Sequence, residues 1–323
     1  MTGFVLASLA LAFAVTLGLG KPGIGWLQRQ QLGDKIREIG LEHHAGKAGT
    51  PTMGGLLMLP VILALAVVLT AVTHGSWRQL APLAVALVGF GALGALDDLA
   101  KVRRRQGQGY GFQVRYKFLW HPGLSLALAA LLFISLGQQS IDIGPYRDIQ
   151  LGWLYVPFAL VAIFSASASS LIDGLDGLSG GVYALCFIAY LAIALHNGQQ
   201  TLALFAGLCI GALLGFLWFN VHPAQVFMGD TGALAFAGVL GVVAMMSRQP
   251  LLLPLIGLML VVDVFSVILQ VGYFKLTHGK RIFLIAPYHH HLEKTGWPEA
   301  KIVQRFWLIT AVTASLGVGL GLL

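Results

Sequence analysis

Aspartates recur at the ends of apolar stretches of this sequence, and they are the residues best suited to chemistry. Asp97 and Asp98 close one apolar run, and Asp230 stands at the start of another. Asp173 and Asp176 lie between two more. A carboxylate beside hydrocarbon is costly unless it has a partner or a function. Clustered carboxylates are natural ligands for Mg²⁺, which prefers oxygen, whereas helix capping or ion pairing is the alternative use of each acid alone.

Two of these acid motifs have features of a ligand site. Adjacent carboxylates such as Asp97 and Asp98 repel each other unless a cation lies beside them, so this pair suits metal binding or proton transfer. The segment SSLIDGLDGLSGG, residues 169–181, combines acids with glycines that let a ligand approach the backbone closely. Its acids, Asp173 and Asp176, are three residues apart and would share a face on a helical turn.

The segment NVHPAQVFMGDTGAL, residues 220–234, offers groups that fit a nucleotide. The Asn220 side chain can hydrogen-bond an amide-like edge such as that of uracil. Phe227 is placed to stack on a base. Because Asp230 stands at the start of an apolar run, its carboxylate can either cap a helix or hold a metal there.

A histidine triplet and several basic residues are candidates for phosphate binding. His289, His290 and His291 are consecutive, so their side chains point in different directions, and the usual zinc spacings are absent. A phosphate or pyrophosphate site, with imidazoles donating hydrogen bonds, fits them better. Further candidates stand near the ends of apolar runs, namely Lys47, Thr52, Lys101 and Lys117. The positive charges of the three lysines also have a purely topological reading.

One acid, Asp263, lies inside the apolar segment VVDVFSVILQ. An ionisable residue within a membrane span is a functional-site hypothesis by default. Pairing with a basic residue to hold a bent helix is the alternative, and the sequence favours neither.

The elements that must position these residues are transmembrane helices. The chain has 323 residues, of which 57% are hydrophobic and only 10% charged. Soluble domains carry about 25% charged residues, so this composition indicates lipid as the solvent. The apolar runs are far longer than the strands of a membrane barrel, which predicts an all-α, polytopic protein with residues 1–323 as a single domain. Ten spans are expected, near 3–20, 52–73, 80–97, 118–137, 151–169, 178–196, 200–219, 232–247, 250–274 and 302–323.

The basic residues predict which side of the membrane each connection faces. Of the 20 lysines and arginines, all but Arg78, Arg147 and Arg248 fall in one alternate set of connections, and so do the candidate acids at span ends. Positive charge marks the cytoplasmic side. The candidate site is therefore expected to be cytoplasmic, with both termini outside. The same rule accounts for the net charge of +7 without a nucleic-acid partner.

Together these motifs resemble the phospho-N-acetylmuramoyl-pentapeptide-transferase family of the polyprenyl-phosphate N-acetylhexosamine-1-phosphate transferase superfamily. The resemblance runs in order through GTPTMGG, DDLAK, RYKFLW, DGLDGL, NVHPAQVFMGDTGAL, the HHHLEKTGWPE segment and VQRFW. It implies ten transmembrane helices, a homodimer in the bacterial plasma membrane, and Mg²⁺ dependence. It also implies the reaction of UDP-N-acetylmuramoyl-pentapeptide with undecaprenyl phosphate, giving lipid I and UMP.

The resemblance also assigns roles to residues. Asp97 would bind or deprotonate the carrier phosphate, with Asp98 beside it, and Asp230 and Asp173 would form the Mg²⁺ centre. The residues implied at the nucleotide end are Lys47, Thr52, Asp176, Asn220 and Phe227. Those implied at the phosphates are Lys101, Lys117, His289, His290 and His291. Ser167 and Ser170 stand where the family usually has asparagines, so contacts from these two positions are not carried over.

Several readings compete at this stage. Direct in-line transfer with Asp97 as base competes with a two-step route through an aspartyl-phosphate on Asp98. The nearest rival function is a sister transferase that uses another UDP-N-acetylhexosamine. A cation-coupled transporter is the rival from another class, but it would need acids near mid-membrane and usually an internal repeat. Only Asp263 fits that picture.

Overall fold

The structure is a bundle of long helices, as the composition predicts. It is a computed structural model that describes residues 2–30, 49–103, 111–143 and 146–323. Within these residues, ten helices are long and apolar enough to cross a membrane. Each of them overlaps one of the ten expected spans, which confirms the expectation of a polytopic helical protein.

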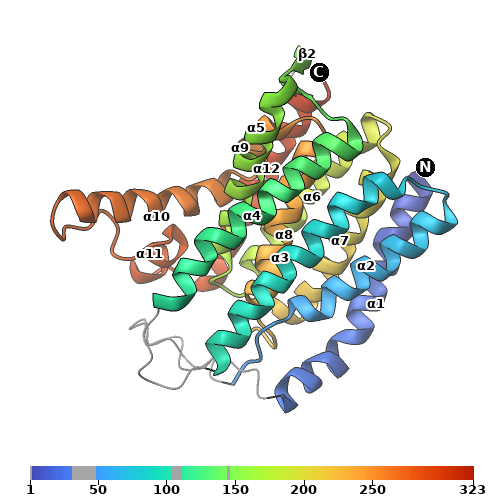
Figure 1. The fold of residues 1–323 in the computed structure, drawn as a ribbon. Coiled ribbons are helices and arrows are strands. Elements are labelled where there is room, and N and C mark those ends of the chain that lie inside the picture. The colour runs from blue at the N-terminus through green and yellow to red at the C-terminus, as the bar shows by residue number, and fades with distance from the viewer. Residues whose placement is uncertain (1, 31–48, 104–110, 144–145) are drawn as a thin grey trace.

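The helices follow one another along the chain with short connections (Figure 1). Nine of the ten spanning segments are built on α1 (Thr2–Arg29), α2 (Gly55–Val72), α3 (Trp77–Arg103), α4 (Gly111–Leu136), α5 (Tyr155–Ser167), α6 (Leu178–His196), α7 (Gln200–Asn220), α8 (Gly229–Met246) and α12 (Glu299–Gly321). Short 3-10 turns flank α5, namely η2 (Gly152–Leu154) before it and η3 (Ala168–Ile172) after it.

Helices α7 and α8 form the centre of the bundle. Nearly all their residues are buried, whereas α1 and α4 bury only a minor part of theirs. Helix α7 packs against α1 and α6, and α8 packs against α3 and α5. Helices that are apolar on every side must be surrounded by protein or lipid. The outer helices expose large side chains such as Leu6, Val68 and Leu308, which fits contact with lipid.

The ninth span differs from the expected continuous segment 250–274. It is broken into η4 (Pro250–Leu252), α9 (Leu253–Ile256) and α10 (Leu258–Leu276). At Gly257 the backbone leaves helical geometry, with φ −101° and ψ 41°. The break lets α10 project away from the rest of the bundle (Figure 1). Its exposed apolar residues include Phe265, Ile268 and Leu269, so lipid is the natural surrounding of this helix.

A hairpin marks the end of the bundle that is opposite the candidate site. Strands β1 (Ser140–Ile143) and β2 (Tyr146–Gln150) pair antiparallel. The guanidinium of Arg248 lies 3.3 Å from a carboxylate oxygen of Asp142 and 2.5 Å from one of Asp148. Both acids of this hairpin segment therefore pair with one basic residue, Arg248.

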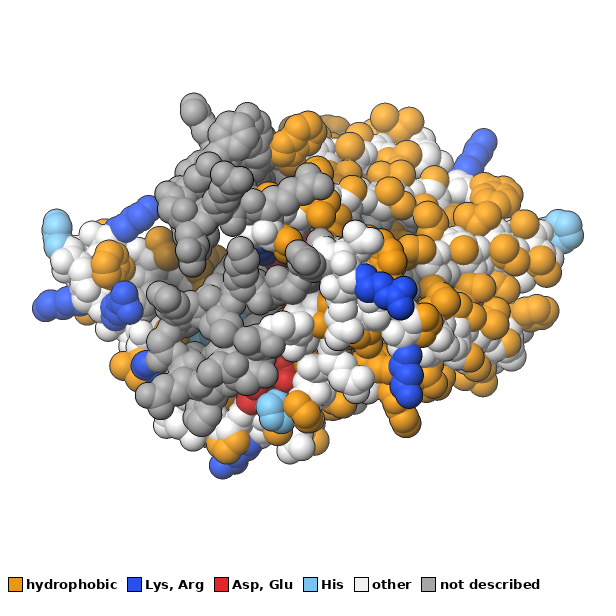
Figure 2. Space-filling model, turned by 90° about the horizontal axis from the view of Figure 1, so that it is seen from below, with side chains coloured by type: hydrophobic (Ala, Val, Ile, Leu, Met, Phe, Trp, Pro, Cys, Tyr) orange, Lys and Arg blue, Asp and Glu red, His pale blue; other side chains and the backbone are white. Residues whose placement is uncertain are grey.

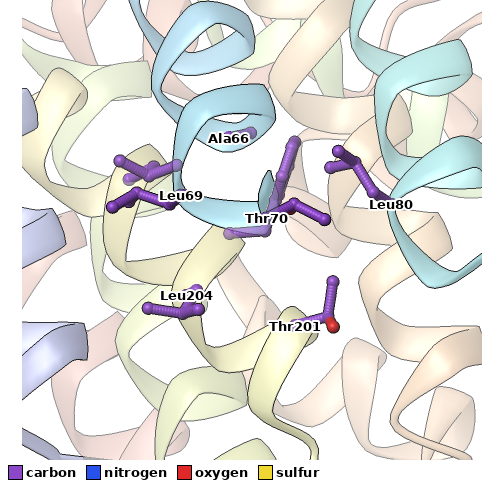
Figure 3. Close-up of a pocket in the computed structure, with 8 residues that line it drawn as sticks. Ala66, Leu69, Thr70, Leu80, Thr201 and Leu204 are labelled. Atoms are coloured by element: carbon purple, nitrogen blue, oxygen red, sulfur yellow. The ribbon is translucent and has the colours of Figure 1, made fainter. Parts of the chain in front are cut away.

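A small hollow lies between α2, α3 and α7 (Figure 3). Its lining is apolar apart from Thr70 and Thr201. Because the lining contains no titratable group, the hollow offers packing space and no acid–base or metal chemistry.

Close approach of two helices brings the acid motifs together at the other end. The last turns of α3 and the start of α8 lie at the lower end of the bundle in Figure 1, away from both termini. Helix α3 can approach α8 closely because residue 94 is glycine. A methyl group on Gly94 would overlap the backbone carbonyl of Asp230. Small residues serve this purpose in membrane bundles.

We expect Gly94→Ala to force α3 and α8 apart. Overpacking of this kind costs about 1–3 kcal/mol, so the thermal midpoint in detergent should fall. The control is Gly123→Ala in α4, where an added methyl group meets nothing within 4 Å. Equal midpoints for the two variants would contradict the close α3–α8 contact.

Candidate active site

Four of the predicted acids converge where α3, α8 and the turn after η3 meet. Asp97 and Asp98 lie in the last turns of α3, and Asp230 lies in the first turn of α8. Asp173 directly follows η3. Asp97 and Asp98 are buried despite their position near the end of the bundle. Figure 2 looks at this end and shows acidic side chains and a histidine together near its middle.

The Lys101 ammonium group holds the acids of α3 and α8 together. Its Nζ lies 2.7 Å from Oδ2 of Asp230 and 3.0 Å from Oδ2 of Asp97. Oδ1 of Asp98 is 3.7 Å away. Lys101 follows Asp97 by one helical turn, so α3 alone sets half of this arrangement. The predicted contact between Lys101 and a phosphate stays a prediction, because the contacts seen here are with carboxylates.

Asp98 has a structural role that the sequence did not show. Its Oδ1 accepts a hydrogen bond from the backbone N–H of Asp230 at 3.1 Å. Its Oδ2 accepts bonds from the N–H of Thr231 at 2.9 Å and from the Thr231 hydroxyl at 2.7 Å. Asp98 therefore caps α8 from a neighbouring helix, which satisfies N–H groups that a helix leaves open. Asp230 itself is thereby left to face Lys101.

The environment of Asp173 favours the protonated acid. The Ser179 hydroxyl donates a hydrogen bond of 2.6 Å to Oδ1 of Asp173. Shielding from water raises the pKa of Asp173 to about 7, with the charges of Asp230 and Asp98 contributing in the same direction and the Ser179 bond opposing. Neighbouring carboxylates act on one another's ionisation here, and a divalent cation would relieve that repulsion. The oxygen-only donors Asp173 and Asp230 thus fit Mg²⁺.

Asp176 faces a different group from Asp173, contrary to the expectation of a shared face. The segment 173–177 is a turn and not a helix, with Gly177 at φ 79°. Oδ2 of Asp176 lies 3.0 Å from Nδ1 of His222, and its backbone N–H donates to Glu299 at 2.7 Å. Ligand atoms of Asp176, His222 and Glu299 all lie within 4.8 Å of one another, so this group could hold a divalent metal.

His222 and Glu299 were not among the residues predicted for the site. His222 belongs to the NVHPAQ motif, but nothing local marks it as a ligand. Glu299 starts α12 and is 123 residues away from Asp176 along the chain. Only the packing of α12 against α6 brings the two together.

Asn220 and Thr52 hold the loops of the site in place. Oδ1 of Asn220 accepts a bond from the N–H of Gly177 at 3.1 Å, and its Nδ2 donates to the carbonyl of Val226 at 2.8 Å. The contact of Asn220 with uracil stays a prediction, since the contacts seen are internal. Thr52 is buried, and its hydroxyl lies next to Gly229.

Phe227 is held in place by backbone bonds to the segment that follows Thr50. Its N–H donates to the carbonyl of Pro51 at 2.8 Å, and its carbonyl accepts from the N–H of Gly54 at 2.9 Å. The GTPTMGG and VFMGDTG motifs therefore lie side by side, as a joint site requires. Whether a base stacks on Phe227 stays a prediction.

The three histidines of α11 (Tyr288–Lys294) do not all point apart, contrary to the expectation for consecutive residues, because Nε2 of both His289 and His290 faces Gly174. The His289 side chain is fully buried against Asp263. Nδ1 of His290 lies 3.1 Å from Oε2 of Glu293. Nδ1 of His291 accepts a bond from the N–H of Leu284 at 3.2 Å. Asp263 thus has its partner in His289 and not in a lysine or arginine.

Three further positions complete the comparison with the expected site. Lys47 lies outside the described residues, and so does the side chain of Lys117, which belongs to α4. The hydroxyl of Ser167 donates 2.7 Å to the carbonyl of Phe164 in its own helix. Ser167 therefore satisfies its hydroxyl locally, which agrees with leaving that position out of the implied contacts.

Comparison with known proteins agrees with this geometry. The sequence profile described as "Glycosyl transferase family 4" matches residues 80–248, which include the acids of α3, α8 and the turn between them. The profile described as "Phospho-N-acetylmuramoyl-pentapeptide-transferase signature 1" matches residues 47–59. A phospho-N-acetylmuramoyl-pentapeptide-transferase of Nitratidesulfovibrio vulgaris strain DP4 is 42% identical over 94% of this chain and 89% of the relative. The chain belongs to the phospho-N-acetylmuramoyl-pentapeptide-transferase family.

Other relatives of the same name match at similar levels. The phospho-N-acetylmuramoyl-pentapeptide-transferase of Geobacillus kaustophilus is 39% identical over 97% of both chains. The one from Chloroflexus aurantiacus strain J-10-fl is 40% identical over 97% of this chain and 88% of the relative. A chain of this family is a phosphoglycosyl transferase.

The raised pKa of Asp173 predicts a pH dependence of stability. Between about pH 4, where a free Asp ionises, and pH 7 the folded state keeps a proton that the unfolded state loses. The stability that this proton provides is therefore lost as pH rises through that window. Asp173→Asn removes the titration, so without divalent cations its thermal midpoint should rise relative to wild type between pH 5 and pH 8.

The control for this measurement is Asp148→Asn in the β1–β2 hairpin. Hydrogen bonds from Ser140 and Arg248 lower the pKa of Asp148, so that group stays ionised between pH 5 and pH 8. Its variant should show the pH slope of the wild type. A wild-type slope in Asp173→Asn as well would contradict the environment assigned to Asp173.

Proposed function

We propose that this chain transfers phospho-N-acetylmuramoyl-pentapeptide from UDP-N-acetylmuramoyl-pentapeptide to undecaprenyl phosphate. The products are lipid I and UMP. The observation that supports this most is the centre of Asp97, Asp230 and Lys101 at one end of a ten-helix bundle, in a chain whose relatives bear that transferase's name. The whole chain, residues 1–323, serves as one transferase domain.

The proposal includes a location and an assembly. The basic residues gather in the connections at the acid-bearing end, which supports a cytoplasmic site in the bacterial plasma membrane and termini on the outer side. Both termini lie at the other end of the bundle (Figure 1). A soluble nucleotide substrate then meets the site from the cytoplasm, and the lipid carrier reaches it from the bilayer. A homodimer is implied by the resemblance to the family.

The chemical problem is that the two substrates are both anions. Lys101 supplies one fixed positive charge between α3 and α8. Asp230, with Asp173 nearby, would hold Mg²⁺. When bound, Mg²⁺ offsets phosphate charge and stabilises the departing UMP. Asp230 is suited to this role because its carboxylate is partly accessible, with 27% of its side chain exposed. Since Asp98 caps α8, the Asp230 carboxylate is not needed for capping.

Asp97 is the acid best placed to prepare the nucleophile. It is buried and lies 3.0 Å from Lys101, so a carrier phosphate held by Lys101 would come within its reach. A phosphate oxygen needs no stronger base than a carboxylate for its last proton. The two-step route on Asp98 is disfavoured, because both oxygens of Asp98 accept hydrogen bonds from the start of α8. Attack through Asp98 would uncap that helix.

The remaining predicted residues surround this centre in the proposal. Phe227, Thr52, Asp176, Asn220 and Lys47 would form the nucleotide end. Lys117, His289, His290 and His291 would contact phosphates. The support for the described members is that their loops meet beside the acid centre.

Two rival functions remain distinguishable by experiment. A sister transferase would accept another UDP-N-acetylhexosamine, and replacing the sugar donor in the assay would reveal it. The family assignment favours a transferase over a cation-coupled transporter, and Asp263, which alone suggested transport, pairs with His289.

We expect purified protein to release UMP from the muramoyl-pentapeptide nucleotide in the presence of undecaprenyl phosphate and Mg²⁺. Asp230→Ala should lower kcat by about 100-fold or more, because it removes a group that stabilises charge in the transition state. Asp148→Asn, which is exposed at the opposite end, should retain most of the activity. Equal rates for wild type and Asp230→Ala would refute the metal assignment.

Sidedness can be measured with a thiol reagent that does not cross membranes. The two native cysteines, Cys186 and Cys209, are buried and give a low background. In spheroplasts, the Tyr146→Cys variant should be labelled at once, because residue 146 is exposed on the outer hairpin. The Lys280→Cys variant should be labelled only after lysis, since the residue is exposed in the connection between α10 and α11, which the proposal assigns to the cytoplasmic side. The reverse pattern would invert the proposed topology.

A further inference from the structure

A buried carboxylate–imidazole pair lies next to the acid centre. Oδ2 of Asp263 is 2.6 Å from Nδ1 of His289, and Oδ1 of Asp263 accepts the backbone N–H of His289 at 3.2 Å. The exposed fractions of the two side chains are 1% and 0%. Asp263 therefore holds both the backbone and the ring of His289, and it does so from another helix, α10.

The other ring nitrogen of His289, Nε2, faces the turn formed by Asp173 and Gly174. Its Nε2 is buried and has no hydrogen-bond partner among the described residues. A methyl group on Gly174 would overlap this Nε2, so the nitrogen lies against the residue that follows Asp173. A buried polar atom without a partner is costly, and a site that receives a ligand is a common reason for one.

The neighbouring histidine repeats the arrangement. Nδ1 of His290 lies 3.1 Å from a carboxylate oxygen of Glu293. Nε2 of His290 would lie 3.0 Å from the same methyl group on Gly174. The two rings are 4.3 Å apart between centroids. In both cases a carboxylate engages Nδ1 and Nε2 faces the turn, so the two pairs converge on one point.

A carboxylate behind an imidazole fixes the ring and its tautomer, and it stabilises the imidazolium. With Nδ1–H committed to Asp263, Nε2 is the nitrogen left to meet a substrate. As an imidazolium, His289 donates a hydrogen bond from Nε2, which suits an anionic phosphate oxygen. A mere brace between α10 and α11 would use the same Asp263 contact but would not require Nε2 to lack a partner beside Asp173.

We propose that Asp263 is a positioning residue that sets His289 so that its Nε2 donates to a phosphate oxygen of the nucleotide donor at the Asp173–Gly174 turn. This inference rests on the proposed function for its substrate. Asp263 itself, beneath His289, does not touch the substrate and acts only through the ring.

The test is a double-mutant cycle on kcat and KM for the nucleotide donor. Asp263→Asn should lower kcat about 10- to 100-fold, as removal of such supporting carboxylates does elsewhere, with KM changed less than about threefold. In the His289→Ala background the same substitution should change kcat by less than about twofold, because its target is gone. Asp263→Glu, which keeps a carboxylate, should recover a large part of the loss.

The matched control is Ser266→Ala, a buried polar residue on the same helix whose hydroxyl donates 2.6 Å to the carbonyl of Asp263. It should keep kcat near the wild-type value. Losses that add up in the double variant, or a wild-type kcat in Asp263→Asn, would overturn the inference. Thermal midpoints of all variants identify any that fail to fold.

A spectroscopic measurement keeps this test separate from the proposed function. In protein labelled with ¹⁵N-histidine, the signal lost in His289→Gln identifies His289. The proposal needs Nδ1–H held by Asp263 while Nε2–H donates, so wild type should show both ring nitrogens protonated. Asp263→Asn removes the charge that stabilises the imidazolium, so one of its two nitrogens should be unprotonated. If wild type releases no UMP, the proposed function fails. The spectrum still tests whether Asp263 positions the His289 ring. An unchanged His289 signal in Asp263→Asn would refute it.

Discussion

Every carboxylate at the acid-bearing end of this bundle needs a partner, because water is scarce there and a lone charge is costly. Asp97 and Asp230 share the Lys101 ammonium group. Asp98 accepts hydrogen bonds from N–H groups at the start of α8. The carboxylates of Asp176 and Asp263 contact the imidazoles of His222 and His289, respectively. Apart from the Asp97–Lys101 contact within α3, each pairing joins segments that are distant along the chain, so these pairings determine which elements lie together at this end.

The same pairings separate supporting acids from those available for chemistry. Asp98 and Asp263 have both oxygens engaged by protein donors, and they hold α8 and α11 in place. Asp230 contacts Lys101, and its charge acts on the ionisation of Asp173. In the proposed site, which must bring two anions together, the acids assigned to chemistry would thus depend on acids that hold the helices in place.

Much of the fold was predictable because lipid imposes a simple rule on sequence. An apolar run long enough to cross the bilayer must be helical, so ten spans could be located from composition and length. The rule says nothing about breaks inside an apolar run. Gly257 therefore went unnoticed, although it divides the ninth span and redirects α10. The expectation that the histidines point apart holds for His291, which bonds Leu284, but Nε2 of both His289 and His290 faces Gly174.

The sequence alone determined that the chain lies in lipid and how many spans it has. It also determined that the acids cluster near one end and to which family they point. These depend on residue types and spacing, which local physics can interpret. Only the tertiary structure decided which acid meets which partner. Asp98 was paired with Asp97 by adjacency but bonds Thr231, and Asp176 was grouped with Asp173 but meets Glu299. Such contacts join residues more than 120 positions apart, and their geometry is set by helix packing, which leaves no local mark in the sequence.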